Sequence, residues 1–82
     1  PNENAVLIVQ AGGRVTYLND RAREWFNLLE NETPNLERLA RNTRPSDAFL
    51  NLCAAAGHAR FNLHQSLIEG VSYQMPSEGS SR

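Results

Sequence analysis

The start of the chain constrains the fold most, because two β-favouring runs stand on either side of a pair of glycines. Residues 5–9 form a continuous apolar run, and residues 14–18 form a second run with β-branched and aromatic side chains. Gly12 and Gly13 lie between them, and glycine adopts the positive φ angles that tight turns require. We therefore predict a β-hairpin at the start of the domain.

Two segments with helical periodicity follow the hairpin. The first begins at Asn19 or Asp20, either of which can cap a helix. Its apolar positions recur at the spacing of one helical face, and they are Ala22, Trp25, Phe26 and Leu29. The second begins with Thr33 as the N-cap and Pro34 as the first helical residue, a position where the missing N–H of proline has no cost. Residues 42–45 break the pattern.

A third helix and a second pair of strands complete the pattern. The helix starts at Ser46 or Asp47 and ends at Gly57, with an inner stripe of Phe49, Leu52, Cys53 and Ala56. Residues 59–64 alternate between apolar and polar types, as a half-buried strand does. After a turn at residues 64–66 we predict a last strand at residues 67–75, whose apolar face is interrupted by Glu69 and which has a bulge at Gly70. One face of it carries Leu67, Val71, Tyr73 and Met75.

The order of these elements predicts an α+β fold. Two hairpins would lie side by side as one antiparallel sheet, covered on one face by short helices. We expect an N-terminal extension at residues 1–4, one domain at residues 5–75, and a linker or tail at residues 76–82, which are rich in serine and glycine. Because the chain begins with Pro1 and not with methionine, we expect it to be a piece of a longer protein.

Composition excludes several classes of function. The net charge of −1 argues against a nucleic-acid surface, which needs an excess of basic residues. No apolar run approaches the roughly 18–20 residues that span a bilayer, so we expect no membrane insertion. The single cysteine cannot form an intramolecular disulfide, which favours a cytoplasmic location.

Few side chains have the arrangement that catalysis or metal binding requires. His58 and His64 are good donors for a metal or haem, but no third ligand shares a recognisable spacing with them. We therefore expect both on the surface and predict no metal site. Helix capping accounts for Ser46 and Asp47, and no oxyanion-hole motif accompanies them. We predict no catalytic residue, and we expect the chain not to be an enzyme.

Apolar residues are the remaining candidates for a binding site. Large aromatic side chains supply most of the burial in so small a domain, so a core role is expected first. Cys53 is expected to act as a small apolar residue. A ligand cavity between helices and sheet would be lined by Trp25, Phe49, Cys53 and Phe61.

Several arginines recur through the helical half, and two interpretations remain open. They form either an anion-binding stripe or a solvated face balanced by glutamates. The arginines are Arg21, Arg23, Arg38, Arg41 and Arg44, and the glutamates are Glu24, Glu30, Glu32 and Glu37.

Residues 5–75 resemble a PAS domain, and two stretches carry the resemblance. The opening, with Gly13, Arg14, Val15, Tyr17, Asn19 and Ala22, resembles the first hairpin and helix of that family. Residues 61–63 and 67–70 resemble the hairpin that follows the PAS helices. Two features depart from the family pattern. Gln10 and Ala11 stand where an acidic residue is usual, and only four strands are predicted where a complete PAS sheet has five. The final strand would lie beyond Met75, and its absence would leave an unpaired edge that invites association.

The resemblance implies a non-catalytic sensory module of a larger bacterial signalling protein, with a sensor histidine kinase as the expected parent. Such a module forms a homodimer, takes a small-molecule ligand, and biases an output domain in the same chain by population shift. Cys53 lacks the neighbours of the flavin-binding cysteine of light-sensing members, so we expect no cofactor. One alternative is a ligand-free dimerisation or spacer module, and a more distant one is a fragment of a small α+β enzyme.

These functions predict different structures. A sensor is expected to contain an apolar cavity of about 300 Å³ or more. A dimerisation module is expected to have a filled core and an apolar outer patch. An enzyme is expected to show clustered ionisable groups with shifted pKa values.

Overall fold

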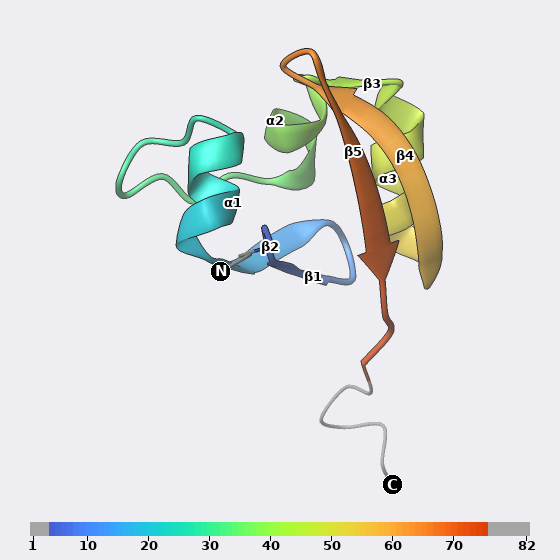
Figure 1. The fold of residues 1–82 in the computed structure, drawn as a ribbon. Helices are drawn as coiled ribbons and strands as arrows, with labels where there is room; N and C mark the ends of the chain where they lie inside the picture. Colours follow the sequence, from blue (N-terminus) through green and yellow to red (C-terminus); the bar gives the residue numbers. More distant parts are fainter. Residues whose placement is uncertain (1–3, 76–82) are drawn as a thin grey trace, which may run out of the picture.

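The structure is a computed structural model that describes residues 4–75. These residues form an α+β fold with five strands and three short helices (Figure 1). In chain order they are β1 (Leu7–Gln10), β2 (Arg14–Leu18), α1 (Asp20–Trp25), α2 (Leu36–Ala40), β3 (Thr43–Arg44), α3 (Ser46–Ala54), β4 (Gly57–Leu63) and β5 (Ser66–Ser72). The tail predicted at residues 76–82 lies outside the described residues.

The strands belong to two antiparallel sheets. One contains β1 and β2, and the other has the order β3-β4-β5. Figure 1 shows the two hairpins as separate ribbons that run in different directions. The prediction of a single layer is therefore wrong for the described residues. Local turn residues determine each hairpin, whereas pairing between distant strands depends on which edges the tertiary packing brings together.

The first hairpin forms as predicted. Gly12 and Gly13 have φ angles of +91° and +87°, in the region that glycine tolerates. The register shifts between Ile8 and Val9, where Thr16 is the extra residue on β2. The Thr16 hydroxyl donates to the carbonyl of Ile8 at 3.3 Å across this bulge.

The second hairpin is regular over its whole length. His64 and Gln65 both have positive φ angles and form the turn, and Leu63 lies opposite Ser66. The register then continues without a shift, so the bulge predicted at Gly70 is wrong. A Cβ atom there would lie 2.6 Å from Cδ2 of Leu52 on α3, so a larger residue would require the Leu52 side chain to move.

Two helix ends differ from the predictions. Helix α1 ends at Trp25 and Asn27 has a φ of +55°, so Leu29 leaves the apolar face and is 74% exposed. Helix α2 is capped by Asn35, whose side chain accepts from the N–H of Arg38 at 2.9 Å. Thr33 and Pro34 therefore precede the helix. Asparagine and threonine side chains can both accept from the free N–H groups of the first helical turn. The sequence is therefore compatible with a helix capped by Thr33 or by Asn35.

The region around α3 shows three further differences. Residues Thr43–Arg44, expected to break the pattern, form β3 and pair with Asn62 and Leu63 of β4. Helix α3 ends at Ala54 with an extended residue after it, so Gly57 begins β4 and does not terminate the helix. Ala56 consequently lies outside the helix and is exposed.

The core lies where the helices meet the inner face of the β4–β5 hairpin. The Phe49 ring lies 5.8 Å from that of Phe26 and 5.3 Å from that of Phe61, the second pair edge to face. Leu39 and Leu63 are buried beside them. Thr43 is fully buried, and its hydroxyl donates to the carbonyl of Ala40 at 2.8 Å. None of the helices in residues 4–75 has the length and apolar character needed to cross a membrane.

Candidate interaction surface

The four predicted pocket residues lie in or against the core. Phe49 and Phe61 are buried and their rings touch, while Trp25 and Cys53 pack against the same cluster. Burial raises the pKa of the Cys53 thiol to about 11, so the group is un-ionised and weakly nucleophilic at neutral pH. The structure thus brings these residues together as packed side chains.

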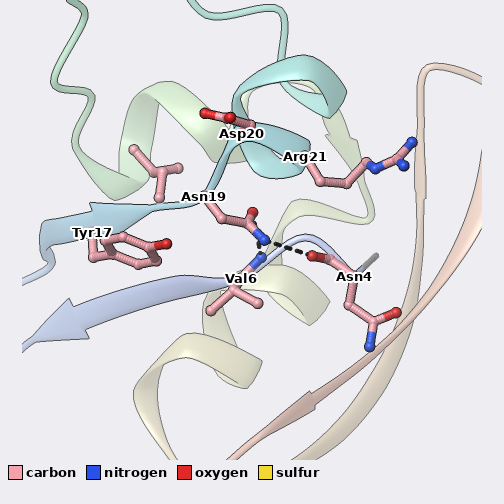
Figure 2. A pocket seen from close by; sticks show the side chains of 7 residues that line it. Asn4, Val6, Tyr17, Asn19, Asp20 and Arg21 are labelled. Carbon is pink, nitrogen blue, oxygen red and sulfur yellow. Dashed lines mark hydrogen bonds between the residues drawn. The ribbon is translucent and has the colours of Figure 1, made fainter. Parts of the chain in front are cut away.

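One surface hollow lies at the open end of the first hairpin, beside the start of α1 (Figure 2). It has a volume of about 540 Å³, is open to solvent, and is lined by residues that include Asn4, Tyr17 and Asn19. The Asn19 carboxamide oxygen accepts from the N–H groups of Val6 and Ala22 at 3.0 and 2.9 Å. Its Nδ2 donates to the carbonyl of Asn4 at 2.8 Å. These bonds tie the start of β1 to the start of α1, so Asn19 has a structural role.

The second hollow, of about 280 Å³, lies at the end of α3 and is lined mainly by small residues together with His58. The other histidine, His64, lies in the β4–β5 turn with Nε2 at 3.4 Å from Nδ2 of Asn27. Both histidines are exposed. Within residues 4–75 there is no group of three or more His, Cys, Asp or Glu side chains that could hold a metal ion.

Arg23 and Arg38 form hydrogen bonds and an ion pair with the loop between α1 and α2. Arg38 pairs with the Glu32 carboxylate at 2.8 Å, and Glu32 also accepts from the N–H of Leu29 at 3.1 Å. This backbone hydrogen bond, followed by the Arg38 contacts, lowers the pKa of Glu32 below its usual value of 4.5. Arg23 donates to three carbonyls of residues 29–32, the shortest at 3.0 Å to that of Glu32. These contacts support the interpretation of a balanced face that holds the α1–α2 loop.

The most unusual surface is the outer face of the β4–β5 hairpin. We define it as the side chains of Leu67, Glu69 and Val71 on β5, together with those of Tyr73 and Met75, which follow the end of the strand at Ser72. Four of them are large and apolar, and these are exposed by 62% (Leu67), 60% (Val71), 82% (Tyr73) and 72% (Met75). Glu69, in the middle, pairs with Arg60 of β4 at 3.0 Å. Several large, exposed apolar side chains in one stretch of chain are typical of an interaction site.

The register explains why this face is exposed. Directly opposite residues of an antiparallel pair share a face. Ile68 lies opposite the buried Phe61, and Gly70 packs against Leu52, so the even-numbered residues of β5 face the core. The odd-numbered residues face outward. The sequence predicted that the apolar residues share a face, but not that this face is exposed.

Comparisons with family models, with curated proteins and with solved structures find no match to this chain.

Proposed function

We propose that this chain is a non-catalytic regulatory module that works by associating with a second copy of itself. The observation that carries the proposal is the outer face of the β4–β5 hairpin, with four large apolar side chains exposed to solvent. In the wider proposal the module belongs to a cytoplasmic signalling protein, with a histidine kinase as the expected parent. The two separate sheets depart from the PAS architecture, so this wider part of the proposal depends on the sequence resemblance alone.

The core favours an association module over a ligand sensor. Phe26, Phe49 and Phe61 are packed ring against ring at the position where the resemblance implies a ligand cavity. The two surface hollows are lined by other residues. A filled core together with an exposed apolar face is the combination expected for a dimerisation module.

The charges on the outer face favour a second copy as the partner. Arg60 neutralises Glu69 at 3.0 Å, so the face carries no excess of either sign. An anionic membrane would require clustered basic residues. A neutral apolar face is compatible with its own copy, and a twofold dimer uses the same patch on both subunits. Ligand or partner signals would then act by shifting the dimer equilibrium.

Sedimentation equilibrium of the wild type and two matched tyrosine variants tests this proposal. Tyr73→Ser removes an apolar side chain from the outer face, while Tyr17→Ser removes one from the 48%-exposed position on β2. We expect the wild type and Tyr17→Ser to form dimers. Truncating an interface tyrosine at a hot spot costs about 2 kcal/mol or more, and the symmetric dimer loses it twice, so Tyr73→Ser is expected to be monomeric. A monomeric wild type at high concentration would contradict the proposal.

A further inference from the structure

The free edge of β5 has a defined set of backbone donors and acceptors. In the β4–β5 turn, Leu63 and Ser66 close a two-residue loop, so they form a hydrogen-bonded pair. Hydrogen-bonded and non-hydrogen-bonded pairs alternate along an antiparallel ladder. Residues 66, 68, 70 and 72 therefore bond to β4. The N–H and C=O groups of Leu67, Glu69 and Val71 point to the opposite edge, where β5 has no strand partner among residues 4–75.

The same residues carry the exposed side chains of the outer face. An added strand on this edge would therefore extend both the hydrogen-bond ladder and the apolar surface. If that strand is β5 of a second copy, the antiparallel arrangement is symmetric, and one residue lies opposite itself on the twofold axis.

Charge selects among the symmetric registers. A register centred on Glu69 places two carboxylates directly opposite each other, which is destabilising. A register centred on Gly70 places Glu69 opposite Val71. A register centred on Val71 pairs Val71 with itself, and it places Leu67 opposite Met75 and Glu69 opposite Tyr73. Tyr73 and Met75 follow the end of β5 at Ser72, so this pairing extends the strand beyond its present end. Only the last pairs each apolar aliphatic side chain with another and gives each Glu69 carboxylate a hydroxyl partner.

We propose that two copies pair through the free edges of β5 in antiparallel orientation, with Val71 on the twofold axis. This deepens the proposed function and rests on it, because it specifies how the second copy binds. The two three-stranded sheets become one six-stranded sheet across the interface. Leu67, Val71, Tyr73 and Met75 of both copies then lie on one surface, which Glu69 interrupts and where Arg60 neutralises the Glu69 charge.

The β1–β2 hairpin is less suitable for pairing with an added strand. Both of its strands are edges, and their pairing shifts between Ile8 and Val9, with Thr16 as the extra residue on β2. Such a bulge increases the local twist and disrupts an edge. The β4–β5 ladder has seven consecutive pairs without a shift. The regular edge therefore offers the longer run of aligned hydrogen-bonding groups.

Disulfide cross-linking tests the register. In a Cys53→Ser background, each of Glu69→Cys, Val71→Cys and Tyr73→Cys is oxidised with glutathione disulfide. Hydrogen-bonded antiparallel pairs have Cα atoms about 5.5 Å apart, within the range of a disulfide. We expect Val71→Cys to give the covalent dimer, and an equimolar mixture of the Glu69→Cys and Tyr73→Cys proteins to give the mixed dimer. A preference for Glu69→Cys homodimers would overturn the register.

A proline variant tests whether the dimer forms through the free edge of β5. Val71→Pro removes the edge-facing N–H, while the bonds from β5 to β4 are kept, since proline is tolerated on edge strands. Val71→Thr is the matched control, because it keeps the N–H and the branched side chain. By light scattering we expect monomeric Val71→Pro and dimeric Val71→Thr. If Val71→Pro fails to fold, the cross-linking pattern decides.

The outcomes separate this inference from the proposed function. If the wild type and folded Val71→Pro are both dimeric, edge pairing is overturned while the association module stands. If the wild type is monomeric and no cysteine variant cross-links, the proposed function fails. The proposed function also fails if the edge of β5 binds a strand of a different protein and not a second copy.

Discussion

Replacing Phe49 with alanine is the sharpest test of the filled core. The side chain is 3% exposed and contacts two aromatic rings, at 5.8 and 5.3 Å between centroids. Phe→Ala changes in cores cost about 3–5 kcal/mol through lost burial and the cavity left behind. Domains have about 0.05–0.15 kcal/mol of stability per residue, or roughly 4–12 kcal/mol for a chain of this length. We therefore expect Phe49→Ala to remove about a quarter or more of the free energy of unfolding.

Urea unfolding, followed by the fluorescence of Trp25, measures this loss. Phe49→Leu keeps most of the volume but loses both ring pairs, each contributing about 0.5–1.5 kcal/mol, so we expect a loss of about 1–3 kcal/mol. Leu29→Ala, at a 74%-exposed position, is the surface control and is expected within about 0.5 kcal/mol of the wild type. A loss below about 1 kcal/mol for Phe49→Ala would show that the site tolerates a void. The residue would then be a cavity wall, as a ligand sensor requires.

Three further predictions concern other contacts. Asn19→Ala removes a helix cap worth about 0.5–2 kcal/mol and two links to β1. We expect it to lower the free energy of unfolding by about 1–3 kcal/mol in urea, more than Asn19→Asp, which keeps the acceptors. The pKa of Glu32 is lower in the folded state than its usual value of 4.5. Its carboxylate therefore stabilises the fold above that pH, and the contribution is lost as pH falls through the folded-state pKa. The stability difference between the wild type and Glu32→Gln should shrink over this acidic range, and a constant difference would contradict the assignment. Cys53, with a pKa of about 11, should react slowly with iodoacetamide in the native state and rapidly in urea; equal rates would refute its burial.

Local signals predicted the hairpins well. The positive φ angles of Gly12 and Gly13 were expected from residue type, and the turn at His64 and Gln65 was expected from the polar break between two runs. The cap by Asn19 was also predicted, because its side-chain oxygen precedes an apolar helical stripe. These features depend on neighbours in the chain, so the sequence contains the information directly.

Features that depend on distant residues were predicted less well. Strand β3 has only two residues and forms because β4 presents Asn62 and Leu63 to it. Gly70 looked like a bulge, whereas the close approach of Leu52 explains it. The single layer failed for the same reason, since no local pattern specifies whether β1 and β5 meet.

The outer face shows that one prediction was within reach of the sequence. A two-residue turn at 64–65 sets Leu63 opposite Ser66, and so sets Phe61 opposite Ile68. Because opposite residues share a face, the burial of Phe61 places Leu67 and Val71 outside. Counting apolar residues favours the opposite orientation. The pairing register therefore decides which face of β5 is buried. The hydrophobic pattern of β5 alone would bury the face that carries Leu67 and Val71, which the register places outside.

Amide hydrogen exchange, measured at low and high protein concentration, is the most direct test of whether two copies associate through β5. It reports on the backbone N–H groups of the strand that is proposed to form the interface. The account predicts that protection of the Leu67, Glu69 and Val71 amides increases with concentration, while that of Ile68 and Gly70, already bonded to β4, changes little. Protection of the three edge amides that does not depend on concentration would contradict association through this strand.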